Sequence, residues 1–432
     1  MHVKIGLRTG AAWTLLLATG QAYALELDVA VANDSEYSTN IRRTSDDEIS
    51  EWRHEPGVDI AAVHEGERYT LNGAYSVFRR IHQKSEFDDD TVSVGSSGFE
   101  WRAIPDALVF DIQDSRTETV IDSQLPDDFN NRQVVGRTSA GARATVPSIG
   151  AHTIELSYRV EHLAADTSET DSDRTMASAA YNVPLTQTST LSLSGTRSTV
   201  DFDDPLAPDY KSWSGRLAYS ATRRQSSLTA GIGYTTNDRE LSRDTASGVT
   251  GDIDLTYAFS EITTGSIGYS HQFQDNTNNP FGGLGAFGGQ VGEQTSGLSE
   301  LFIEDSAYAN ISTEFSGTTV SIGLDASRSD YEDIPRDEKR ASVTLDLSRE
   351  VRPGLTVAFY SALSRVEFVD ADDQYDELRT GIRTAFDVTR KLSAHLDVEY
   401  QKRKQDVAPI DYDVWGFTVG LRYALVGARR LF

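Results

Sequence analysis

The chain has no cysteine, few methionines and few histidines among its 432 residues. The absence of cysteine excludes a disulfide framework and an N-terminus acylated on cysteine. The 8 histidines are scattered along the sequence, so their spacing does not suggest a zinc or iron site. Nor is there an apolar run of the ~20 residues that a membrane-spanning helix needs. We therefore exclude a helical membrane protein.

Positive charge is also scarce. The 40 Lys and Arg residues face 66 Asp and Glu residues, and the formal net charge is −26. This balance opposes nucleic acid or an anionic lipid surface as a partner. Only 38% of residues are hydrophobic, which is usual for a soluble protein. A membrane β-barrel has a similar composition, because each strand turns only every second side chain toward lipid.

The N-terminus has the features of a secretory signal peptide. Lys4 and Arg8 precede a short apolar run at 11–18, and Ala22-Tyr23-Ala24 follows it. A basic start, an apolar stretch of this length and an A-x-A end predict cleavage after Ala24. Residues 1–24 are then the signal, and residues 25–432 form a single domain.

Alternation of apolar and small or polar residues is the main pattern of the rest of the chain. In 415–425, Trp, Phe, Val, Leu, Tyr and Leu occupy every second position, and Gly, Thr, Arg and Ala occupy the others. The same period recurs at 25–31, 69–77, 154–160, 213–219, 228–234, 249–259, 320–326, 341–347 and 392–400. A period of two predicts β-strands with one apolar face, whereas a helix would scatter these residues around its axis.

The connections between these strands alternate between nine short turns and ten long loops. Short turns on one side and long loops on the other are typical of an outer-membrane barrel. We predict an all-β, antiparallel transmembrane barrel of 20 strands in the Gram-negative outer membrane, with both termini in the periplasm. Its second strand and segment 300–315 are the least regular, and without them the count is 18. Aromatic residues fall near both predicted rims, as two girdles at the membrane interfaces would.

The last strand resembles the signal that the barrel assembly machinery recognises. Gly420, Tyr423 and Leu425 carry this resemblance, and Phe432 supplies a second aromatic end. The strand stops seven residues short of the C-terminus. Which of the two segments is recognised stays open.

The positions between the apolar ones should face the lumen, and many of them are charged. Candidates for a translocation path are Arg216, Arg379, Arg383, Arg422, His395, Asp397, Glu399, Asp252, Asp254 and Asp346. One interpretation is a hydrated wall in which opposite charges pair across neighbouring strands. The other is a path for substrate, with an arginine track formed by Arg379, Arg383 and Arg422.

The predicted outer loops carry acidic clusters at 46–48, 88–90, 127–128, 201–204 and 370–373. They are either solvated surface or oxygen ligands for divalent cations that bridge to lipopolysaccharide phosphate. We predict no other cofactor. The Gly- and Asn-rich loop 276–290 either folds inward as a constriction or stays at the surface.

An enzyme is the remaining class to consider. No Ser stands in a nucleophile-type context, and His152, Glu155 and Ser157 share one strand without forming an evident catalytic constellation. We therefore predict a non-enzyme.

Residues 99–111 (FEWRAIPDALVFD) and 126–131 (PDDFNN) form a strand, a Pro-containing turn, a second strand and a P-x-x-x-N loop. This stretch resembles outer-membrane β-barrel proteins associated with PEP-CTERM and exopolysaccharide biosynthesis loci. The resemblance implies a conduit or accessory for exopolysaccharide export, with the polymer and periplasmic export proteins as partners. A porin for small solutes and a structural or adhesive surface barrel stay open as alternatives.

Overall fold

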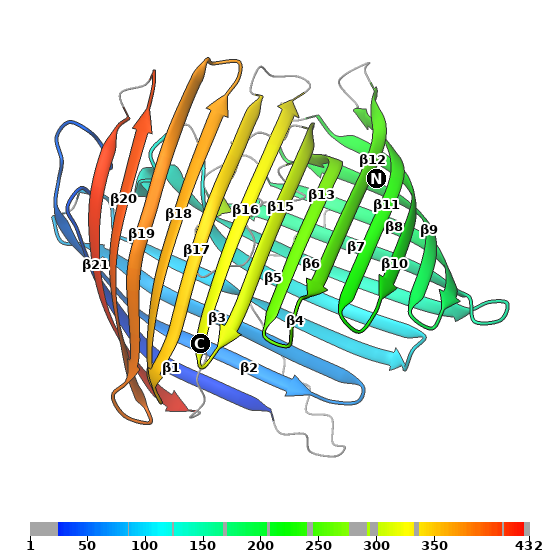
Figure 1. Ribbon diagram of the computed structural model, residues 1–432, viewed down its shortest axis with the longest axis horizontal. Coiled ribbons are helices and arrows are strands. Elements are labelled where there is room, and N and C mark those ends of the chain that lie inside the picture. Colours follow the sequence, from blue (N-terminus) through cyan, green and yellow to red (C-terminus); the bar gives the residue numbers. More distant parts are fainter. Residues whose placement is uncertain are drawn as a thin grey trace.

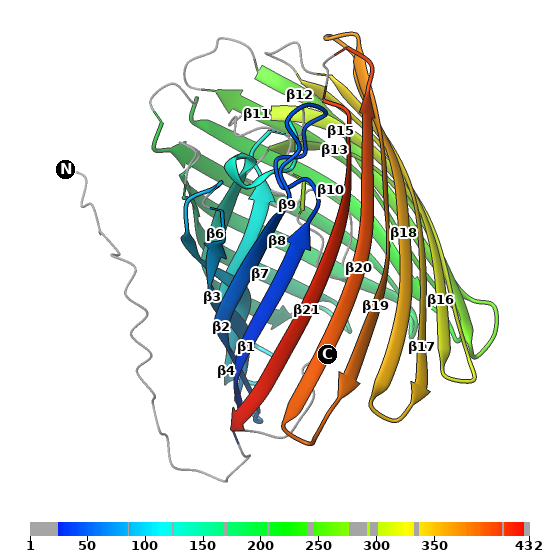
Figure 2. The ribbon, with the colours of Figure 1, turned by 90° about the vertical axis from the view of Figure 1, so that its left-hand side faces the viewer.

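The computed structural model shows a closed antiparallel β-barrel in which the first and last strands pair with each other (Figures 1 and 2). The structure describes residues 25–84, 86–122, 125–166, 171–204, 208–239, 245–275, 292–293, 301–331, 337–407 and 410–426. The predicted signal peptide, its cleavage site and Phe432 lie outside these residues. Within them, no helix is long and apolar enough to cross a membrane.

Twenty strands of 13–16 residues form the wall, and one two-residue strand lies apart from it. The first ten are β1 (Glu26–Ser38), β2 (Glu51–Glu65), β3 (Tyr69–His82), β4 (Asp90–Ile104), β5 (Leu108–Val120), β6 (Arg132–Pro147), β7 (Thr153–Ala165), β8 (Ser172–Thr186), β9 (Ser189–Phe202) and β10 (Tyr210–Thr222). They are followed by β11 (Ser226–Arg239), β12 (Thr245–Ala258), β13 (Thr263–Asp275), β14 (Gly292–Glu293), β15 (Leu301–Phe315), β16 (Thr318–Tyr331), β17 (Glu338–Arg352), β18 (Leu355–Phe368), β19 (Asp373–Asp387), β20 (Leu392–Gln405) and β21 (Tyr412–Val426). A single 3-10 turn, η1 (Phe129–Asn131), precedes β6.

The prediction of 20 wall strands is confirmed, and both of the least regular segments are strands, β2 and β15. At a tilt of ~40°, strands of 14 residues span about 35 Å, enough for the ~25 Å apolar band of an outer-membrane barrel. The wall begins and finishes at the end that carries the short turns, because Val29 of β1 pairs with Val426 of β21 there. We call this the turn end and the opposite one the loop end.

The apolar register faces outward, as the alternation predicts. Leu217, Ile232 and Leu324 are 45%, 60% and 49% exposed, although a soluble fold would bury such side chains. Aromatic residues line both rims, and a group at the loop end includes Tyr37 and Trp52, whose rings are 5.3 Å apart. These two were not expected there, because the regular alternation of the N-terminal segment covers only 25–31. In the structure β1 and β2 pair as far as Ser38 and Glu51.

Candidate functional site: a lumen with an inward-folded hairpin

The hairpin of β5 and β6 leaves the wall at the loop end. Pairing between β4 and β5 stops at Gly95 and Arg116, and pairing between β6 and β7 stops at Val135 and Ala165. The two hairpin strands nevertheless stay paired with each other as far as Val120 and Arg132. The outermost residues of β5 and β6 therefore form a two-stranded arm whose edges no longer pair with β4 or β7.

The departure begins at a glycine. Gly95 has φ of +146°, and a Cβ at this position would lie 2.2 Å from the carbonyl oxygen of Ala74. Only glycine adopts this backbone conformation without strain and tolerates so close an approach. Beyond it, β4 continues beside β3 up to Asp90 without its former partner β5.

The arm turns into the lumen and packs against the inner side of the wall. By alternation from Ile112, which is 53% exposed, Glu118 and Val120 belong to the outward register of β5. Val120 is instead 2% exposed, and Glu118 binds Arg80, which belongs to the inward register of β3. The outward face of the arm thus meets the inward face of β3, which requires the arm to lie inside the barrel.

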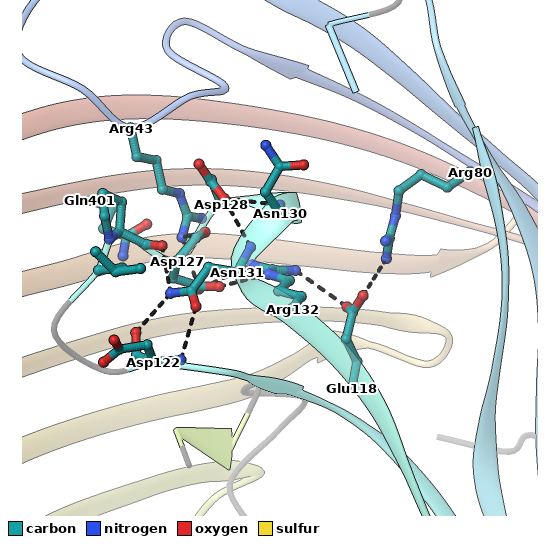
Figure 3. A network of polar contacts seen from close by, with 12 residues as sticks. Arg43, Arg80, Glu118, Asp122, Asp127, Asp128, Asn130, Asn131, Arg132 and Gln401 are labelled. Atoms are coloured by element: carbon teal, nitrogen blue, oxygen red, sulfur yellow. Dashed lines mark hydrogen bonds and ion pairs between the residues drawn. The ribbon is translucent and has the colours of Figure 1, made fainter. Parts of the chain in front are cut away.

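Alternating charges link this arm to the rest of the barrel (Figure 3). Arg80 contacts Glu118 at 2.9 Å, and Glu118 also contacts Arg132 at 3.3 Å. Arg132 reaches Asp127 at 2.6 Å, and Asp127 contacts Arg43 of the β1–β2 loop at 2.8 Å. Burial alone would raise the pKa of Asp127, but the two neighbouring guanidinium groups outweigh it and lower the pKa to about 2.

Phe129 lies at the centre of a cluster of cations. The guanidinium carbons of Arg53, Arg80 and Arg132 are 4.6, 4.7 and 5.1 Å from its ring centroid. The rings of His82 and Phe87 pack against it at 5.1 and 5.4 Å. Each cation–π contact adds about 0.5–2 kcal/mol, depending on desolvation. The ring therefore fixes the arm to β2 and β3 in addition to the ion pairs.

The tip of the arm is organised by side chains of the segment 126–131 (PDDFNN). The side chain of Asn131 donates to the carbonyl oxygens of Asp122 and Pro126 and accepts from the amide of Asp122. Asp128 caps η1 by accepting from the amides of Asn130 and Asn131. The amide of Asn131 and the carboxylate of Asp128 thus satisfy backbone groups at the tip that a regular turn would otherwise pair.

From this tip the chain reaches another part of the wall. Arg403 of β20 donates to the carbonyl oxygen of Leu125 at 3.1 Å. Along the wall β4, β3, β2, β1 and β21 lie between β5 and β20, so this contact crosses part of the lumen. Strand β14 adds to the arm from the other edge, since Gly292 and Glu293 pair in parallel with Thr119 and Val120. The loop proposed as a constriction, 276–290, lies outside the described residues, and the segment that is described as entering the lumen is the β5–β6 arm.

A cavity of about 1420 Å³ extends from the arm to the turn end. Its lining includes Asp127, Phe129 and Arg132 at one end, and the turn residues Pro353 and Lys391 at the other. Between them it is bounded by the inward faces of β1–β4 and β18–β21.

The candidate residues predicted from the sequence are lumen-facing, and most of the basic ones are paired. Arg379 contacts Glu399 at 2.8 Å, and Arg383 contacts Asp397 at 2.7 Å. Further along the wall, Arg422 contacts Asp59 at 2.8 Å, Arg216 contacts Asp252 at 2.6 Å, and His395 lies 3.6 Å from Asp34. The arginine track is therefore a set of ion pairs, between the neighbouring strands β19 and β20 for Arg379 and Arg383 and across β1 for Arg422. Its part in translocation stays a prediction.

Inward glycines determine how these long side chains lie. Gly141 stands between Arg159 and Asp111 on the adjacent strands, and these two side chains meet across it at 2.5 Å. Gly420 stands in the same way between His395 and Asp34. A Cβ at Gly420 would lie 1.9 Å from the imidazole. The missing side chain lets its neighbours lie along the wall instead of projecting into the lumen.

The sequence did not single out two lumen-facing tyrosines. Tyr308 donates to Asp254 across Gly268, and Tyr360 donates to Glu399 at 2.7 Å across Gly381. Both tyrosines stand in the polar register, so alternation alone marks them as inward. The glycine opposite each of them becomes visible only once the register between strands is known.

Among the described residues, no three His, Asp or Glu side chains converge as metal ligands would. Binding of divalent cations by the outer loops stays a prediction. His152 contacts the hydroxyl of Tyr181 at 2.5 Å, and Ser157 contacts Ser178 at 2.6 Å.

No family model matches the chain, and no curated protein matches it. Several solved structures match the chain. The siderophore receptor PirA from Acinetobacter baumannii is 9% identical with a TM-score of 0.50, over 94% of this chain and 81% of that one. The ferric enterobactin receptor PfeA in complex with BCV-L6 is 10% identical with a TM-score of 0.50, over 94% and 82%. The FrpB iron transporter from Neisseria meningitidis (F5-1 variant) is 7% identical with a TM-score of 0.48, over 92% and 82%. At such identities the similarity shows the fold alone, a large closed barrel of the kind found in Gram-negative outer-membrane receptors.

Proposed function

We propose that this protein is an outer-membrane conduit through which exopolysaccharide leaves the cell. The turn end lies in the periplasm and the loop end at the cell surface. The polymer enters beside the short turns, passes along the polar register of the wall and leaves past the β5–β6 arm.

The observation that carries this proposal is the self-neutralised polar lining. Arg379, Arg383 and Arg422 each have a carboxylate partner within the wall, at 2.7–2.8 Å. A wall whose charges are satisfied internally is wettable and holds a passing hydrophilic chain only weakly. The width is sufficient in principle, because barrels of 16–18 strands already leave an aqueous channel.

Support for the polymer comes from the 99–131 resemblance. Residues 99–111 form the wall-paired ends of β4 and β5 and the Pro105 turn between them, and residues 126–131 form the tip of the arm. One part of the stretch that carries the resemblance, the tip at 126–131, thus belongs to the arm that enters the lumen. An export role gives such a segment a purpose, which is to control passage while no polymer is present.

The same arm favours a second candidate, a porin for small solutes. An arm anchored to Arg43 and Arg403 narrows the lumen, and a narrowed lumen suits sugars or ions better than a polymer. The two candidates differ in what happens to cells that lack the protein.

Deletion of the gene tests this difference. A conduit requires that surface polysaccharide falls sharply in the deletion strain, that the polymer accumulates in the periplasm, and that the wild-type gene restores export. Unchanged surface polysaccharide, together with ordinary small-solute flux through purified protein in liposomes, would discard the conduit and leave the porin. Unchanged polysaccharide without solute flux would leave a structural or adhesive barrel.

A further inference from the structure

Two rows of side chains with the same composition cross the inner wall. The first runs over β16, β15, β13 and β12 and consists of Asp325, Tyr308, Gly268 and Asp254, paired residue by residue. The second runs over β17, β18, β19 and β20 and consists of Asp346, Tyr360, Gly381 and Glu399. Each row is a carboxylate, a tyrosine, a glycine and a second carboxylate.

The glycine makes each tyrosine lie along the wall. A Cβ at Gly268 would lie 2.3 Å from Cε1 and 2.8 Å from Cζ of Tyr308, so the ring rests directly on the glycine. A Cβ at Gly381 would lie 2.4 Å from Cζ of Tyr360. Beyond the glycine each hydroxyl donates to the far carboxylate, Asp254 or Glu399, which fixes the orientation of the ring.

Such a ring has one face on the wall and the other toward the lumen. Tyr308 is 36% exposed although its edge and its hydroxyl are occupied. The ring of Tyr360 is partly covered, because the guanidinium of Arg383 lies 5.8 Å from its centroid. Tyr308 is therefore the more open of the two.

We propose that the Tyr308 and Tyr360 rows are binding platforms for an uncharged saccharide chain, which deepens the proposed conduit function and rests on it. The C–H face of a sugar ring packs against the aromatic face. Its hydroxyls donate to the carboxylates on either side, Asp254 and Asp325 in the first row. Glu399 is paired with Arg379, but the three aspartates of the rows, Asp254, Asp325 and Asp346, disfavour an acidic polymer, since like charges repel.

The two platforms are far enough apart to hold different units of one chain. Three strand spacings and four residues of offset separate Tyr308 from Tyr360, which places them roughly 20 Å apart along the wall. A long oligosaccharide can engage both at once, whereas a disaccharide engages one.

Single-channel recording with added oligosaccharide tests the platforms. Maltohexaose, a neutral hexasaccharide, should interrupt the ion current of the wild-type barrel, and a galacturonic acid hexamer should do so less. Tyr308→Ala should shorten the interruptions about two- to tenfold, the range for loss of one aromatic contact. Tyr308→Phe keeps the ring and should retain most of the dwell time.

Gly268→Ala is the sharper variant, because it keeps the tyrosine residue and changes only the surface on which its ring packs. The new Cβ forces the ring off the wall and away from Asp254, so the dwell time should fall as it does in Tyr308→Ala. Tyr158→Ala, at a lipid-facing position that is 53% exposed, is the matched control and should change nothing.

The outcomes separate this inference from the proposed function. Wild-type interruptions that are unaffected in both Tyr308→Ala and Tyr360→Ala would overturn the platforms and leave the conduit. A wild-type current that ignores maltohexaose would also overturn the platforms, and export in the deletion strain would then decide the conduit separately.

Discussion

Replacing Arg80 with alanine should release the β5–β6 arm from the wall. The Arg80 side chain is 5% exposed and contacts Glu55 and Asp90 at 3.2 Å and Glu118 at 2.9 Å. It also supplies one of the three guanidinium groups around Phe129. Arg80 is therefore the only residue among these contacts that joins the arm, β2 and the outer end of β4.

The expected magnitude follows from what is left behind. Asp90 is about half exposed, so its contribution is small, as for other solvent-screened pairs. Glu55 and Glu118 are 17% and 15% exposed, and each would keep one cationic partner, Arg53 at 3.0 Å and Arg132 at 3.3 Å. Losing one of two cationic partners of a poorly solvated carboxylate costs about 1–3 kcal/mol, which corresponds to a rise of roughly one to two decades in the released population.

A single introduced cysteine measures that population, because the chain has no cysteine of its own. Val120 is 2% exposed, so in Val120→Cys a thiol reagent should react slowly while the arm is packed. Adding Arg80→Ala should accelerate labelling and increase the ion conductance of the purified barrel. Arg116→Ala is the control, because Arg116 still pairs within the wall and its carboxylate neighbour is 3.9 Å away. Equal labelling rates with and without Arg80 would refute the claim that this side chain holds the arm.

Three further predictions concern the wall, its acid response and its orientation. Leu217→Arg on the lipid-facing register should lower the free energy of unfolding by ~2–4 kcal/mol and impair assembly. Ser214→Arg on the lumen face of the same strand should be tolerated, and equal losses of stability in the two variants would contradict the assigned faces. The pKa of Asp127 is about 2, below its ordinary 3.8, so its ion pairs stabilise the arm above about pH 4 and are lost as the pH falls toward 2. Conductance should therefore rise over that range in the wild type and show no such step in Asp127→Asn. An epitope inserted at Asp89 should be reachable on intact cells and one at Pro353 should not, and the reverse result would invert the barrel.

Much of the fold could be predicted from the sequence because a barrel wall repeats one local rule. Alternation depends only on neighbouring residues, so the strand at 415–425 can be recognised without any knowledge of its partners. Strand ends are less predictable. β2 begins at Glu51 because it continues to pair with β1 outside the apolar band, where alternation no longer marks it.

The arm could not be predicted, because nothing local distinguishes it from an ordinary hairpin. Glu118 continues the alternation of β5, and only the loss of pairing beyond Arg116 shows that its face has been reversed. The acidic pair Asp127 and Asp128 was expected to be solvated surface or a cation site. Instead, Asp127 binds two arginines and Asp128 caps a 3-10 turn. The platforms were missed for a related reason, since Tyr308 and Gly268 are 40 residues apart and meet only through strand register.

Blocking the lumen during export is the most direct test of the conduit. Thr256 follows Asp254 in the inward register of β12 and is the site for a single cysteine. Attaching a bulky, water-soluble thiol reagent to Thr256→Cys in growing cells should stop new polysaccharide from reaching the surface. The same treatment of Asp89→Cys at the outer rim should have no effect. Undiminished export through barrels that are fully modified at position 256 would contradict passage of the polymer through this lumen.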